Sequence, residues 1–155
     1  MRRVCNDGAD IDARETMALA AMVSGMTLAN AGLGAAHGIG AGLGATLGVR
    51  HGIACGMLLP HVMRYNVAHG VTKYADLAPG LCGRTFHDDT KAALAAADAV
   101  AQLCADLRLP ATLGEMGVTK DMAGRLAAAS MGSSMSKNPV LISQDACEEF
   151  ILSLI

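Results

Sequence analysis

The feature that most constrains the fold is a long uncharged segment that is unusually rich in glycine. No Asp, Glu, Lys or Arg occurs from Thr16 to Val49, and glycine recurs at every fourth position from Gly40 to Gly56. Glycine is costly inside a helix unless it lets another element approach closely. The segment therefore predicts tightly packed helices, placed either in a helical core or in a membrane.

The membrane interpretation is the weaker of these two. The length of the segment and its small-xxx-small spacing would suit a membrane hairpin. However, its apolar residues are mostly Ala, it contains Asn30 and His37, and it lacks an aromatic belt and a flanking basic cluster of consistent sign. We therefore expect a buried central helix pair and no membrane association.

The composition favours one all-α domain. A chain of 155 residues can bury its own core, so residues 1–155 are expected to form a single domain. Aromatic residues make up only 3% of the chain, so Ala, Leu, Val and Met carry most of the apolar surface, and alternating strand patterns are absent. We predict a compact all-α fold of about six to eight helices. The net charge of −2 and the scattered basic residues argue against nucleic-acid binding.

Capping and breaking residues predict the helix boundaries. Pro60 is expected to kink or break its helix near Leu59. One face of the helix after Asp88 or Asp89 is expected to enter the core through Leu94, Ala97, Val100, Ala101 and Cys104. The predicted helices run from Asp10 or Asp12 to about Ala31, from before His37 to about Leu47, from Arg50-His51 to about Asn66, from Thr72 to Cys82 ended by Pro79-Gly80, from Asp88 or Asp89 to about Leu107, from Thr119 to Ala129, and from Ser143 to the terminus.

The cysteines and the amino terminus point to the cytoplasm. The five cysteines are odd in number and widely spaced, with no CxxC pair, so we interpret them as reduced and mostly buried thiols. The amino-terminal sequence becomes acidic at once and has no apolar core of a signal peptide.

His37 and His51 are the candidate metal ligands. A neutral imidazole binds Fe, Zn, Cu or Ni. The two histidines are too far apart to share one helix face, but they would converge if the chain folds back near Gly48. Spacing alone favours a structural or incidental histidine pair over a metal site. The nearby GxGxxA pattern, which begins at Gly40, is interpreted as helix packing because no strand precedes it, and His61 either lines a cleft or serves packing.

The region from Asn30 to Asn66 resembles the signature of the iron-dependent (group III) alcohol dehydrogenases, a family that includes lactaldehyde reductase and propanediol dehydrogenases. Weaker similarity extends over the whole chain, including the segment before this region and the KNPVLIS turn. The residues that match the signature are Asn30, Gly32, Gly34, His37, Gly38, His51, Gly52, Leu59, Pro60, His61, Val62 and Asn66.

The resemblance implies that this chain corresponds to the carboxy-terminal helical domain of such an enzyme. Members hold a divalent metal, usually iron and sometimes zinc, between this domain and a nucleotide-binding α/β domain. One Asp and three His bind the metal, and two of these histidines fall on His37 and His51. The other two ligands and the phosphate-binding glycines are expected before Met1, so no catalytic or nucleotide-binding residue is assigned here. Ala41 stands where many members have a histidine near the nicotinamide.

The implied activity is hydride transfer between an alcohol and NAD or NADP at a metal-bound oxygen. By itself the chain is expected to be incomplete and inactive, and to act with a nucleotide-binding domain or subunit. An apolar face that includes Leu33, Ile39 and Met57 is expected to be exposed and to favour self-association. The alternative is a non-catalytic helical module for assembly or regulation that retains the family fold.

Overall fold

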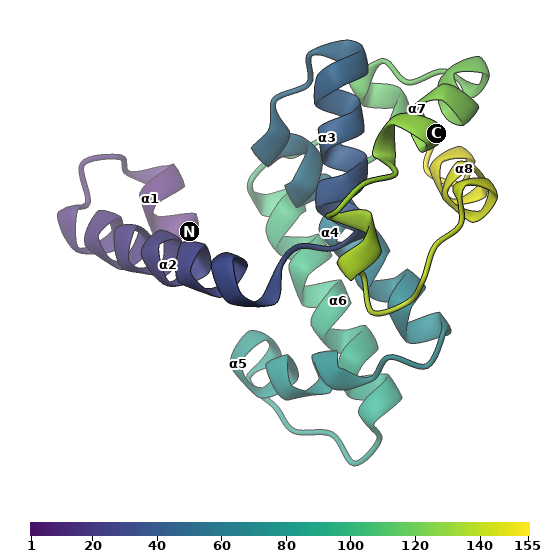
Figure 1. The fold of residues 1–155 in the computed structure, drawn as a ribbon. Coiled ribbons are helices and arrows are strands. Elements are labelled where there is room, and N and C mark those ends of the chain that lie inside the picture. The colour runs from purple at the N-terminus through teal and green to yellow at the C-terminus, as the bar shows by residue number, and fades with distance from the viewer.

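A computed structural model describes all residues 1–155 and contains only helices and loops (Figure 1). This confirms the predicted all-α fold, with eight α-helices and four short 3-10 helices. In chain order they are α1 (Arg2–Asn6), α2 (Ile11–Ala31), α3 (Ala35–Leu47), α4 (His51–Ala68), η1 (Lys73–Leu77), α5 (Ala78–Cys82), α6 (Asp89–Asp106), η2 (Gly114–Met116), η3 (Lys120–Met122), α7 (Ala123–Ser130), η4 (Met135–Lys137) and α8 (Gln144–Leu152).

Local signals set most helix ends where the sequence predicts them. Asp10, Asp88 and Ser143 each accept a hydrogen bond from a backbone N–H in the first turn of α2, α6 and α8. Gly48 ends α3 in the left-handed conformation, with φ 67°. The predicted cap at Thr119 is wrong, because its side chain makes no capping hydrogen bond and the short helix η3 precedes α7.

Pro60 was expected to kink or break its helix, and it does not break it. Helix α4 runs through it from His51 to Ala68. A proline leaves the carbonyl four residues earlier without its helical partner. Here that carbonyl belongs to Gly56, and it accepts a hydrogen bond from the Cys104 thiol of α6 at 3.2 Å. The tertiary contact with α6 therefore replaces the hydrogen bond that the proline removes.

Two further predictions need correction. Pro79 and Gly80 do not end a helix: Pro79 lies in the first turn of α5, where a missing N–H is harmless, and Gly83 ends that helix. Leu94 is 39% exposed rather than part of the core. The buried face of α6 consists of alanines, which allow closer approach to α4, α5 and η1 than a leucine would: Ala92, Ala93, Ala96 and Ala97.

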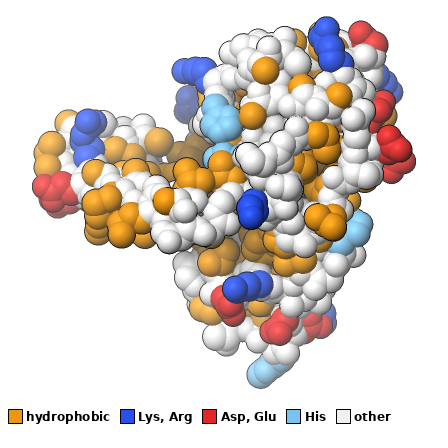
Figure 2. Space-filling view, in the orientation of Figure 1, with side chains coloured by type: hydrophobic (Ala, Val, Ile, Leu, Met, Phe, Trp, Pro, Cys, Tyr) orange, Lys and Arg blue, Asp and Glu red, His pale blue; other side chains and the backbone are white.

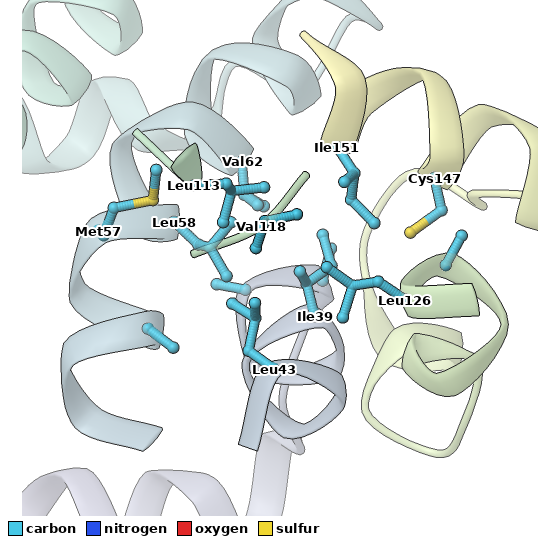
Figure 3. Close-up of a cluster of buried hydrophobic side chains, with 14 of the residues drawn as sticks. Ile39, Leu43, Met57, Leu58, Val62, Leu113, Val118, Leu126, Cys147 and Ile151 are labelled. Atoms are coloured by element: carbon cyan, nitrogen blue, oxygen red, sulfur yellow. The ribbon is translucent and has the colours of Figure 1, made fainter. Parts of the chain in front are cut away.

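The main core surrounds α3, which packs against α4 and α7, and α8 closes it from the side of α7 (Figure 3). Ile39 and Met57 lie in this core with exposures of 0% and 1%. The prediction that they form an exposed apolar face is therefore wrong, and Leu33 is half-buried. Their side chains fill the space between helices that the glycines of α3 bring together.

Helix α2 projects from the body of the molecule, with α1 folded back on it (Figure 1). Ala13 is its only buried residue, and apolar side chains lie on much of its visible surface (Figure 2). No single helix is long and apolar enough to span a membrane; α2 and α3 pass such a test only as a pair, and they meet at an angle of 102°. Helix α2 therefore carries much of the exposed apolar surface, at Ile11, Leu19, Met22, Val23, Met26 and Leu28.

Candidate metal centre

The first turns of α3 and α4 carry the two predicted ligands. His37 is the third residue of α3, and His51 is the first residue of α4. The turn from Gly48 to Arg50 joins the two helices, which pack against each other. This arrangement brings His37 Nδ1 within 3.1 Å of His51 Nε2. The convergence that metal binding would require is therefore present.

A third side chain, Cys55, joins the two histidines. It lies one helical turn after His51, on the same face of α4. Its Sγ atom is 3.5 Å from His37 Nδ1 and 3.3 Å from His51 Nε2. The three donor atoms lie within 4.8 Å of one another, so they could contact one ion together. Sequence interpretation missed Cys55, although its position four residues after His51 was a usable signal.

Gly40 provides the room for this cluster. A Cβ atom at this position would lie 2.9 Å from Cys55 Sγ and 3.5 Å from two ring atoms of His51. Any larger residue would push the thiol aside. The GxGxxA pattern that begins here lies inside α3, and the Cβ position of Gly42 faces Ser130 and Leu126. The glycines therefore serve close packing, as predicted, and do not form a phosphate-binding loop.

Burial shifts the pKa values of His37 and Cys55 in opposite directions. Burial, and then the charge of His51, lowers the pKa of His37 below its ordinary value of 6.5. His37 is thus neutral, which is the form that binds metals. Burial raises the pKa of the Cys55 thiol to about 11, so without a metal it carries its proton. His37 and Cys55 are half-buried and His51 is exposed, so the cluster opens to solvent on one side.

The remaining histidines and thiols lie apart from this cluster. His61 is half-buried and lines a cavity of about 170 Å³ with Arg64 and Cys104, so it combines packing with access to a small cavity. Ala41 is exposed. All five cysteines are free, but only Cys147 is fully buried, so the prediction of mostly buried thiols is wrong. Cys55, Cys82 and Cys104 are half-buried, and Cys5 is exposed.

A network of buried amides anchors the helix that carries His37. Asn138, in the loop after η4, accepts a hydrogen bond from the Ala35 N–H at the start of α3. It also donates to Asn66 Oδ1 of α4 at 2.8 Å, and Asn66 donates to the Tyr74 hydroxyl. Both asparagines are buried, with exposures of 5% and 0%. The network ties the amino-terminal turn of α3 to α4 and to the loop after η4.

The donor set fits a divalent transition metal. Two imidazoles and a thiol are ligands that Zn²⁺ and related ions prefer. The space above Gly40 keeps their donor atoms together. The cluster consists of two histidines and one cysteine and contains no carboxylate.

Comparisons with known proteins agree with this architecture. The model of the Fe-containing alcohol dehydrogenase family, C-terminal, matches residues 1–155. Lactaldehyde reductase of Escherichia coli K12 is 41% identical over 126 residues, which are 79% of this chain and 32% of that protein. The 1,3-propanediol dehydrogenase of Citrobacter freundii is 39% identical over 119 residues, or 76% of this chain and 31% of that protein.

A solved structure shows the same fold. The crystal structure of a 1,3-propanediol oxidoreductase superposes with a TM-score of 0.92 at 30% identity, over 99% of this chain and 41% of that one. The chain spans about a third of the length of the curated relatives that it matches. The chain therefore belongs to the Fe-containing alcohol dehydrogenase family, whose C-terminal helical domain it matches over its full length.

Proposed function

We propose that this chain is the metal-binding helical domain of an NAD(P)-dependent alcohol dehydrogenase or aldehyde reductase. His37 and His51 hold a divalent metal in this proposal, with iron as the first candidate and zinc as the second. The single observation that carries it is the 3.1 Å approach of the two imidazole nitrogens, from two helices, in a chain of this family. The names of the relatives, which concern small alcohols and aldehydes, support the substrate class.

The residues of the chain have definite tasks in this function. A divalent metal, when bound, supplies Lewis-acid polarisation of an alcohol or carbonyl oxygen. His37 and His51 present their nitrogens from two packed helices, so little side-chain freedom is lost on binding. The open side of the cluster leaves room for a substrate oxygen, and burial lowers the pKa of His37, so protons compete less for its nitrogen at neutral pH.

The nucleotide requires a further domain or subunit. The one dinucleotide-like pattern of the chain lies inside α3 and serves helix packing. We propose that a nucleotide-binding partner supplies the NAD or NADP site and that the chain is inactive without it. The exposed apolar surface of α2 supports such a partner, because only one of the 21 residues of this helix is buried against the rest of the chain.

The second candidate is a non-catalytic helical module for assembly or regulation. The projecting apolar helix α2 favours it, because an assembly surface needs no metal. The two proposals differ in metal affinity. A module of this kind would tolerate replacement of either histidine without any change in metal binding.

Metal binding by the purified full chain is the decisive test. Equilibrium dialysis against Zn²⁺ or anaerobic Fe²⁺ should give about one ion per chain. Replacing a second-sphere group typically weakens metal binding about 10- to 100-fold, so His37→Ala or His51→Ala should weaken it by at least this much. His87→Ala is the matched control, since His87 is exposed and lies outside the cluster. Equal binding by all four proteins, or no binding by any, would refute the proposed function.

A further inference from the structure

We propose that Cys55 is a third ligand of the metal, so that this chain supplies two histidines and one cysteine to the ion. The proposal rests on the proposed function, because it concerns the same ion. The inference comes from the place of its sulfur atom beside the two histidine nitrogens.

The distances among the three donors match the edges of one coordination tetrahedron. With ordinary Zn–N and Zn–S bond lengths, tetrahedral coordination puts two nitrogens about 3.4 Å apart, and a nitrogen and a sulfur about 3.6 Å apart. The observed separations are 3.1 Å between the histidine nitrogens, and 3.5 and 3.3 Å from Sγ to His37 and His51. Each edge needs a change of only a few tenths of an ångström. One ion can therefore contact all three atoms without a rearrangement of either helix.

The backbone holds the thiol in this position. Cys55 and His51 are four residues apart on α4, which places both side chains on one face of the helix. Gly40 of α3 lies opposite, and a Cβ atom there would come within 2.9 Å of the sulfur. The thiol thus occupies a space that only glycine leaves open. A residue that merely filled space would not need to stand within hydrogen-bonding distance of both imidazoles.

A sulfur ligand changes which metal the site prefers. Thiolates are soft donors that favour Zn²⁺ over harder ions, and two histidines with one cysteine differ from the oxygen-containing sets that suit Mg²⁺ or Mn²⁺. On binding, the Cys55 thiol proton would pass to solvent and the thiolate sulfur would bond to the ion. The sulfur ligand therefore shifts the preference of the site towards zinc or a zinc-like ion.

Cobalt substitution tests this role of Cys55 separately from metal binding itself. The full chain, kept reduced, is titrated with Co²⁺ while dialysis gives the amount bound and absorption reports the ligands. A cysteine ligand produces a sulfur-to-cobalt charge-transfer band in the near ultraviolet. We expect this band in the wild-type chain, its loss in Cys55→Ser and Cys55→Ala, and its retention in Cys82→Ser. Cys82 is the matched control because it is also half-buried and lies outside the cluster.

A second variant tests the geometry rather than the thiol. Gly40→Ala keeps all three donors but should displace the sulfur, and the band should weaken while the far-ultraviolet circular dichroism stays helical. Cobalt that binds without the band, or a band that survives Cys55→Ser, would overturn the role of Cys55 and leave the proposed function intact. A wild-type chain that binds no cobalt at all would overturn both.

Discussion

The buried asparagine pair offers the sharpest quantitative test of the structure. In Asn138→Ala, the Ala35 N–H at the start of α3 loses its acceptor, and Asn66 Oδ1 loses its donor. Ala35 and Asn66 have exposures of 0%, so water does not reach these groups in the native arrangement. A buried polar group left without a partner costs about 1–3 kcal/mol, and two of them should cost about 4 kcal/mol together.

Thermal or urea unfolding followed by circular dichroism measures this loss. For a chain of this size, a change of 1 kcal/mol moves Tm by about 2–4 °C, so Asn138→Ala should lower Tm by about 8–16 °C. Asn30→Ala is the control, since the Asn30 amide bonds to the Met26 carbonyl at the exposed surface of α2. Its effect should stay within about 0.5 kcal/mol, as is usual for surface substitutions.

A double-mutant cycle separates the asparagine network from the loss of side-chain volume. Asn138→Ala strands Asn66 Oδ1, whereas in Asn66→Ala the Asn138 amide keeps its hydrogen bonds with Ala35 and Val140. Asn66→Ala with Asn138→Ala also removes the stranded oxygen. The double variant should therefore lose less stability than the sum of the two single variants, by about 0.5–3 kcal/mol. Additive losses, or a loss below about 1 kcal/mol for Asn138→Ala, would show that the buried hydrogen bonds do not stabilise the fold as reasoned here.

Three further outcomes are expected. In Gly42→Ala, the added Cβ would lie 2.7 Å from a serine hydroxyl of α7, so overpacking should outweigh the gain in helix propensity and lower the free energy of unfolding by about 1 kcal/mol. Gly52→Ala is the control, because its added Cβ would have no neighbouring atom within 4 Å, and it should raise the free energy of unfolding by about 1 kcal/mol. Chemical unfolding measures both changes. Burial, and then the charge of Arg64, lowers the pKa of His61 in the folded chain, so near and below pH 6.5 the unfolded chain binds more protons. The contribution of neutral His61 to the free energy of unfolding should therefore be fully present above about pH 6.5 and be lost as the pH falls towards the lowered pKa. His61→Gln should reduce this pH dependence in thermal melts. The double change Met22→Glu with Met26→Glu should reduce self-association in sedimentation velocity without lowering Tm, because both side chains are exposed; unchanged association would mean that α2 is not the contact surface.

Several elements could be predicted from the sequence because their causes are local. The caps at Asp10, Asp88 and Ser143 and the left-handed glycine at Gly48 act within one turn of the chain. Each therefore depends only on neighbouring residues, which a sequence displays directly. The absence of alternating apolar patterns excluded strands in the same local way.

At several other positions a distant residue decides the outcome. Pro60 stays inside α4 because the Cys104 thiol, 48 residues away on α6, bonds to the carbonyl that proline frees. Leu94 is exposed because α6 packs closely against its neighbours through a different face, which consists of alanines. Ile39 and Met57 are buried because α3 is surrounded, a fact that apolar character alone could not reveal.

The sequence by itself determined the family, the helical fold and the two histidines as candidate ligands, because helix signals are local and the signature from Asn30 to Asn66 is specific. Only the tertiary structure decided that His37 and His51 converge to 3.1 Å, and that Cys55 completes the cluster above Gly40. A coordination site depends on where side chains of separate helices meet. That meeting point follows from the packing of α3 on α4, which no single stretch of sequence encodes.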